Sequence, residues 1–114
     1  MIAVIFEVMP HPDRKNAYLD MAAQMRPLVD EVEGFISVER FQSLTNPDKL
    51  LSLSFFEDEA AIDRWRTLSA HRQAQSAGRK GMFTDYHLRI AHVIRDYGLF
   101  DRDEAPADSK AAHG

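Results

Sequence analysis

The segment from Trp65 to Arg79 carries side chains whose types and spacing suit chemistry on a small molecule. Its functional groups are those of Trp65, Arg66, His71, Arg72, Gln75 and Arg79. Trp65, Arg72 and Arg79 follow one another at intervals of seven, and His71 and Gln75 at an interval of four. On a helix these intervals form two adjacent rows, so aromatic, cationic and amide groups would line one cleft. The alternative is a core tryptophan whose polar neighbours solvate the helix end.

Glu7 is the one ionisable side chain in an otherwise apolar opening strand. Burial of a carboxylate disfavours its charged form, so an unpaired Glu7 would have a raised pKa and would suit a base that contacts the ligand. An ion pair with Arg40 or Arg89 would instead give it a structural role. The ion pair is the favoured interpretation, because unpaired buried carboxylates are rare.

The chain has five histidines and no cysteine. None of the histidines stands in a closely spaced group with carboxylates, so no metal site is predicted. The lack of cysteine excludes disulfides, thiolate metal sites and iron–sulfur clusters. His87 and His92 are five residues apart in a predicted strand, which places them on opposite faces of a sheet.

Hydrophobic periodicity predicts four strands and two helices. The strands are expected over 2–9, 35–44 and 49–57 and within 82–97, most clearly over 86–95, and the helices over 13–32 and 58–78. Pro27 should kink the first helix or tighten its last turn, and Gly34 should end it. Asp58 is expected to cap the second helix.

The element order βαββαβ predicts an α+β, ferredoxin-like domain with an antiparallel sheet, spanning residues 1–100. Two helices can cover only one face of such a sheet, and the other face also carries apolar residues. We therefore expect a homodimer, with a second copy on the uncovered face. Residues 101–114 lack apolar periodicity and are expected to form a flexible C-terminal tail.

Composition excludes several classes of protein. The net charge of −4 comes from mixed charges with no basic stripe, so nucleic acid is not an expected partner. No apolar run approaches the roughly 20 residues that cross a bilayer, and membrane association is not expected. The first residues lack a basic segment before their apolar stretch, so a cytoplasmic location is predicted.

Four segments together resemble antibiotic biosynthesis monooxygenase domains: the opening strand 2–9, Val32-Glu-Gly-Phe-Ile36, the strand 51–56, and the helix 65–75 that starts Trp-Arg-Thr-Leu-Ser-Ala-His-Arg. The resemblance implies a dimeric α+β barrel with a pocket between sheet and helices. It also implies oxidation without metal or flavin, in which a deprotonated substrate reduces dioxygen directly.

Heme-degrading relatives within this resemblance use an asparagine, a tryptophan and a histidine. Trp65 matches the tryptophan, whereas Glu7 stands at the asparagine position and Gln75 at the histidine position. Two of the three residues differ, so heme binding or degradation is the second alternative function, with His71 as the axial ligand.

The predicted function is cofactor-independent monooxygenation of a small aromatic or quinol-type molecule. In this hypothesis His71 removes the phenolic proton, Arg72 or Arg79 stabilises the oxyanion, and the ring of the substrate stacks on Trp65. The predicted catalytic residues are His71 and Trp65, and the predicted substrate contacts are Glu7, Arg72, Gln75, Arg79, Phe83 and Tyr86. The first alternative is a dimeric module that binds a small ligand without reacting it.

Overall fold

The structure, a computed structural model, describes residues 1–74 and 81–113, with only the helical backbone for 70–74. Its elements are β1 (Ile2–Pro10), a single 3-10 turn (Pro12–Arg14), α1 (Lys15–Asp30), β2 (Phe35–Gln42), β3 (Leu50–Phe56), α2 (Glu59–Ala74), β4 (Phe83–His92) and α3 (Ala107–His113). The four strands pair antiparallel in the order β2-β3-β1-β4. The predicted α+β, ferredoxin-like fold is confirmed.

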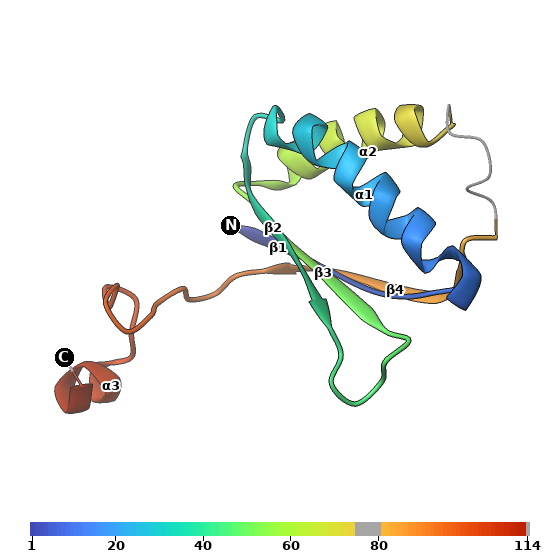
Figure 1. The fold of residues 1–114 in the computed structure, drawn as a ribbon. Coiled ribbons are helices and arrows are strands. Elements are labelled where there is room, and N and C mark those ends of the chain that lie inside the picture. The colour runs from blue at the N-terminus through green and yellow to red at the C-terminus, as the bar shows by residue number, and fades with distance from the viewer. Residues whose placement is uncertain (75–80, 114) are drawn as a thin grey trace.

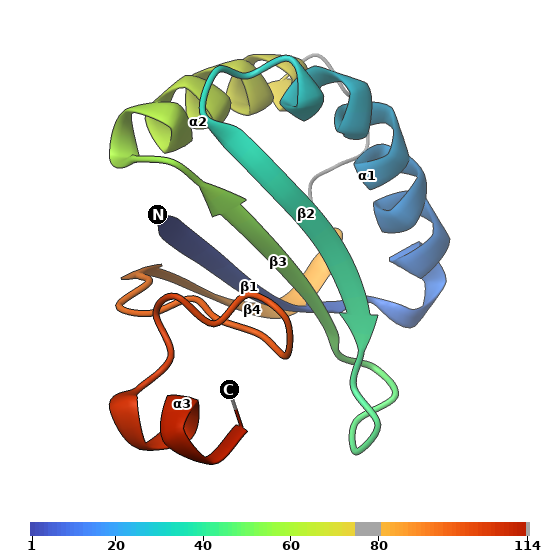
Figure 2. The ribbon, with the colours of Figure 1, turned by 90° about the vertical axis from the view of Figure 1, so that its left-hand side faces the viewer.

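Helices α1 and α2 lie on the same side of the sheet (Figures 1 and 2). We call the side of the sheet toward these helices the inner face and the opposite side the outer face. Strand register assigns residues to the two faces: Val4 stands opposite Ser54 and Ile90 on the inner face, and Ile5 opposite Leu53 and Arg89 on the outer face. Residues two positions apart along a strand share a face.

The core between sheet and helices consists of two separate clusters. One contains the buried residues Ile2, Val29, Phe56, Ala61 and Ile62, and Trp65 packs against it. The other contains Val8, Tyr18, Leu50 and Met82, with Phe6 and Phe83 packed against it. The two ends of β3 therefore carry large buried side chains, whereas Ser52 and Ser54 between them are small.

The ends of both helices follow from local chemistry. The backbone N–H of Glu31 donates to the carbonyl of Leu28 at 3.3 Å, and that of Val32 to Val29 at 3.0 Å. These three-residue steps form the tightened last turn expected near Pro27. The carboxylate of Asp58 accepts a hydrogen bond from the backbone N–H of Ala61 at 2.9 Å, which confirms the predicted N-cap.

Several predicted boundaries were wrong. Strand β4 spans Phe83–His92, which lies within the predicted range 82–97 but three residues before its clearest part, 86–95. Strand β2 ends at Gln42 rather than at 44. The Gln42 side-chain amide donates to the carbonyls of Pro47 and Lys49, both at 3.0 Å, and so closes the hairpin loop. The predicted end of the second helix, residue 78, lies outside the described residues.

The C-terminal segment departs most from the prediction. A segment without regular structure was expected from residue 101, but residues 107–113 form α3, which lies apart from the sheet and the two long helices (Figure 1). Arg102 donates to the carbonyl of Gly98 at 3.1 Å and to the Ser109 hydroxyl at 2.6 Å, and Lys110 donates to the Asp103 carbonyl at 2.8 Å. These local hydrogen bonds, which hydrophobic periodicity does not reveal, join α3 to residues 98–103. The flexibility of the tail stays a prediction.

Across the described ranges 1–74 and 81–113, no helix has the length and hydropathy required to cross a membrane.

Gly34 permits a close approach between the loop after α1 and helix α2. Its φ is +90°, and a Cβ at this position would lie 2.7 Å from the Cβ of Ala61. We expect Gly34→Ala to destabilise the protein by roughly 1–3 kcal/mol through overpacking, in addition to about 1–2 kcal/mol for the left-handed backbone. Urea unfolding followed by circular dichroism measures this loss.

Gly81 provides the matched control, because its φ is +76° but, chain neighbours aside, no atom of a described residue lies within 4 Å of a Cβ placed there. Gly81→Ala should therefore show only the backbone cost. Equal losses in the two variants would contradict the close packing of Gly34 on Ala61.

Candidate functional site

A cavity of about 290 Å³ lies between the inner face of the sheet and helices α1 and α2. The sheet contributes Val4, Phe6, Arg40, Ser52, Ser54, Phe56, Phe83, Leu88 and Ile90 to its lining. The helices contribute Tyr18, Met21, Ala22, Met25, Ile62, Trp65, Arg66 and Ser69. A smaller cavity of about 80 Å³ adjoins it, and the two share Arg40, Ser52, Ser54 and Trp65 in their linings.

Aromatic side chains form one end of the main cavity. The ring of Phe83 lies 6.2 Å from that of Phe6 and 5.6 Å from that of Tyr18, in edge-to-face arrangements. Trp65 approaches from α2 beside the other core cluster. An apolar ligand in this cavity would therefore meet aromatic side chains from the sheet and from both helices.

The polar groups of the lining are few, and the charged ones are cationic. Arg40 comes from β2 and Arg66 from α2, and Ser52, Ser54 and Ser69 supply hydroxyls. Among the described residues, no Asp, Glu or His lines the main cavity. The site combines an apolar body with a locally positive potential, which suits an uncharged or anionic organic molecule.

Of the aromatic residues predicted for the site, Trp65 and Phe83 line the cavity. Tyr86 does not line it, and its side chain is well exposed. Tyr86 stands opposite Val8 on the inner face, and its ring lies 5.7 Å from that of Phe6 and 6.2 Å from that of Phe83, next to the aromatic end of the cavity.

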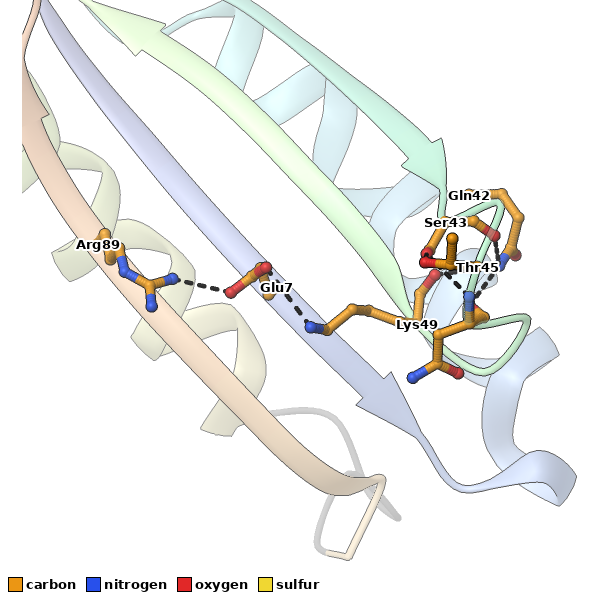
Figure 3. A network of polar contacts seen from close by, with 7 residues as sticks. Glu7, Gln42, Ser43, Thr45, Lys49 and Arg89 are labelled. Carbon is orange, nitrogen blue, oxygen red and sulfur yellow. Dashed lines mark hydrogen bonds and ion pairs between the residues drawn. The ribbon is translucent and has the colours of Figure 1, made fainter.

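The structure places Glu7 away from the cavity. Glu7 stands opposite Leu51 and His87 on the outer face, whereas its neighbour Phe6 faces inward. Arg89 donates to its carboxylate at 2.8 Å, and the Lys49 ammonium lies at 3.5 Å (Figure 3). The predicted pairing with Arg89 is confirmed. The alternative of a base with a raised pKa is wrong, because the Arg89 hydrogen bond and the Lys49 charge hold the pKa of Glu7 below its ordinary value.

The remaining predicted residues are not described in full. His71 and Arg72 belong to α2, but their side chains lie outside the description. Gln75 and Arg79 lie outside the described residues altogether. Their assignment to the site stays a prediction. Within the described residues, no group of three or more potential ligands is arranged to hold a metal ion.

Sequence reasoning missed the polar wall made by Arg40, Ser52 and Ser54. The signal was present in β3, whose sequence Leu-Leu-Ser-Leu-Ser-Phe-Phe alternates large and small residues. This alternation shows that one face of the strand carries hydroxyls. Only the pairing with β1 shows that this face points toward the helices, because it places Ser54 beside Val4.

The family model for antibiotic biosynthesis monooxygenase matches residues 1–77, about two thirds of the chain. This match covers β1 to α2, the elements that supply most of the cavity. The chain belongs to the antibiotic biosynthesis monooxygenase family. The resemblance inferred from the sequence is confirmed.

Two curated relatives match over 93 residues, 82% of this chain. The protein named jasmonate monooxygenase ABM of Pyricularia oryzae is 46% identical over 43% of its own length. The chain therefore spans less than half of that relative. The protein YqjZ of Bacillus subtilis is 28% identical over 79% of its length.

The solved structure of Rv0793 from Mycobacterium tuberculosis has the same fold, with a TM-score of 0.72 and 20% identity. The superposition covers 85% of this chain and 98% of the Mycobacterium chain. At this level of identity the comparison shows the shared fold alone.

The Glu7 ion pair makes stability depend on pH. Because the folded-state pKa of Glu7 is lowered, its contribution is present above the ordinary value of 4.5 and is lost as the pH falls through the folded-state value. We expect Glu7→Gln to lower the thermal unfolding midpoint at neutral pH. The difference from the wild-type protein should shrink as the pH falls below 4.5. Thermal unfolding across this pH range provides the measurement.

Glu39 lies on the same outer face opposite Leu53, and no ion pair forms with it among the described residues. Glu39→Gln is therefore the control, and it should cause a smaller change at neutral pH. A loss in Glu7→Gln that stays constant with pH would contradict the ion-pair explanation.

Proposed function

We propose that the protein is a cofactor-independent monooxygenase that oxidises a small aromatic or quinol-type molecule in the cavity under α1 and α2. The observation that carries the proposal is an apolar cavity of about 290 Å³, bounded by Trp65 and Phe83, in a chain of the monooxygenase family. The volume is near the lower limit of typical small-ligand sites, roughly 300 Å³. A compact ligand of one to three fused or linked rings fits this description.

The proposed reaction requires a substrate that supplies its own electrons. In an anthrone-type substrate, one oxygen atom of dioxygen replaces the two hydrogens of a CH2 group. The other oxygen atom leaves with these hydrogens as one molecule of water. Deprotonation of the substrate gives a carbanion that reduces dioxygen, so the protein must bind the substrate, remove a proton and stabilise the resulting anion. No external reductant is needed for this balance.

The proposed roles extend the sequence prediction. His71 is the proposed base, Arg72 or Arg79 the proposed partner of the oxyanion, and Gln75 a further substrate contact. Trp65 supports the role assigned to it because its side chain lines the cavity. It would hold the ring of the substrate by stacking.

Jasmonate is a second candidate substrate. The Pyricularia oryzae relative is named as a jasmonate monooxygenase and is 46% identical over the shared region. Jasmonate is a small cyclic ketone with a carboxylate, and the cavity has apolar walls and two arginines. Because hydroxylation of a saturated carbon needs two further electrons, this candidate is assayed with and without an added reductant.

Oxygen consumption by metal-free protein tests the function. We expect uptake above the uncatalysed rate with at least one compound from a panel of anthrones, hydroquinones, flavonols and jasmonate. His71→Ala should lower the rate about a hundredfold or more through loss of the base. Trp65→Ala should raise KM by removing the stacking surface.

His113→Ala serves as the control, because His113 lies in α3 and is exposed. Tight binding of a quinol without oxygen uptake would overturn the proposal and favour the non-enzymatic binding module. A Soret band that appears with hemin and is lost in His71→Ala would instead favour the heme alternative.

We also propose that the working form is a homodimer. On the outer face, Leu51, Leu53 and Phe55 of β3 alternate with the inward serines, and Ile5 and Phe41 stand opposite them on the neighbouring strands. Phe41 is 42% exposed. The C-terminal segment also presents exposed apolar side chains, with Phe100 at 94%. Apolar surface of this extent supports burial against a second copy.

Phe41→Glu should convert the dimer to a monomer, because it places a charge in the proposed interface. Leu19→Glu introduces the same charge at an exposed apolar position on α1 and should leave the dimer intact. Sedimentation equilibrium distinguishes the two forms. A monomeric wild-type protein at micromolar concentration would contradict the proposal.

A further inference from the structure

We propose that Arg40, together with Ser52 and Ser54, forms an anion subsite that holds the carboxylate of an amphipathic substrate. This inference rests on the proposed function and narrows it to a substrate class: small apolar molecules that carry one acidic group. The observations that support it are the register of the strands, the position of Arg40 over Tyr18 and the lack of a competing carboxylate in the cavity.

Strand register brings the three side chains together. Arg40 of β2 stands directly opposite Ser52 of β3, and Ser54 follows on the same face. Directly opposed residues have Cβ atoms roughly 5 Å apart, so a guanidinium and a hydroxyl at these positions can hydrogen-bond to one small anion. All three residues line both the main cavity and the adjoining smaller one. The subsite therefore lies where the two cavities meet.

Tyr18 favours one position of the guanidinium. The Cζ atom of Arg40 lies 5.9 Å from the centre of the Tyr18 ring, within the range of a cation–π contact. Tyr18 is buried in α1, across the cavity from β2. The Arg40 side chain thus extends over the cavity toward α1. A guanidinium held by an aromatic face keeps its N–H groups available for an anion.

Three other arginines of the described region are already engaged by protein oxygens, whereas the side chain of Arg66, the second arginine of the cavity lining, makes no hydrogen bond to a described residue. Arg26 pairs with Asp30 at 3.0 Å, Arg89 with Glu7 at 2.8 Å, and Arg64 donates to the Glu33 carbonyl at 3.0 Å. Within the described residues, no protein oxygen accepts a hydrogen bond from Arg40. The Ser52 and Ser54 side chains likewise make no hydrogen bond to a described residue. A ligand anion would satisfy these groups together.

The rest of the cavity defines the other end of the ligand. Apart from Arg66 and Ser69 on α2, the lining beyond the subsite is mainly apolar, and the part near β4 includes Phe6, Phe83, Leu88 and Ile90. Arg40 is itself an exposed residue, so a carboxylate bound to it keeps contact with water and avoids the cost of full desolvation. This arrangement places the acid at the mouth of the cavity and the hydrocarbon body inside.

Binding of a matched pair of ligands tests the inference. Cyclohexylacetate and cyclohexylacetamide share the same apolar body and differ in charge. Neither absorbs where tryptophan is excited, so the fluorescence of Trp65, the single tryptophan, reports binding in the cavity. We expect the wild-type protein to bind the carboxylate about tenfold or more tightly than the amide, as for a charge-assisted hydrogen bond.

Single-residue variants show which side chains cause the preference for the carboxylate over the amide. Arg40→Gln should remove the preference for the carboxylate, and Ser52→Ala should reduce it, while both retain affinity for the amide. Arg64→Gln is the matched control, because it removes the same charge from an exposed position outside the main cavity. The Arg64→Gln variant should prefer the carboxylate over the amide as strongly as the wild-type protein does. Circular dichroism confirms that each variant is folded.

Two results would overturn the inference. One is a wild-type protein that binds the acid and the amide equally. The other is an equal loss of the preference in Arg40→Gln and Arg66→Gln, together with a wild-type preference that disappears in high salt. This result would indicate a diffuse positive potential rather than a subsite. Oxygen uptake is measured separately. An Arg40-dependent preference without oxygen uptake supports the subsite and contradicts the monooxygenase function. Oxygen uptake without a preference for acids supports the monooxygenase function and contradicts the subsite.

Discussion

The period of two in strand β3 is the constraint on which the rest of the structure depends. Leu50, Ser52, Ser54 and Phe56 must point toward the helices, and Leu51, Leu53 and Phe55 must point away from them. In an isolated one-sided sheet the covered face is normally apolar and the open face polar. In this strand the middle of the covered face is polar and the open face is apolar. A shift of one residue would exchange the two faces, so the register fixes both.

The inward serines divide the core. Their side chains are too small to reach the helices, so the apolar packing separates into one cluster around Phe56 and Ile62 and another around Tyr18 and Leu50. Helix α1 contributes to both clusters, with Val29 in one and Tyr18 in the other, and the cavity is the space that remains between sheet and helices. The outward leucines have the opposite effect, because they leave an apolar surface without cover in a single chain. Ligand site and interface thus originate in the same strand.

Local patterns were sufficient to predict the elements, and pairing was needed to place the site. The apolar run of β1, the alternation in β2 and β4, the stripe of α1 and the Asp58 cap predicted the fold. The face of Glu7 could not be read from β1 alone, because an apolar strand gives no sign of which side carries the helices. The registry with Leu51 and His87 places it outside the cavity. Arg40 was overlooked as a site residue for the same reason.

The size of the cavity bears on whether it is a packing defect or a binding site. An empty apolar cavity that is fully enclosed costs roughly 24 cal/mol of stability for each Å³. This cavity of about 290 Å³ opens to water at Arg40, so the cost applies only to its enclosed apolar part. Polar groups in the wall reduce the cost only when water or a ligand occupies the space. Larger apolar residues in place of Ser52 and Ser54 would fill the cavity and stabilise the fold. Small polar residues at both positions oppose stability, which is the expected pattern for a binding site.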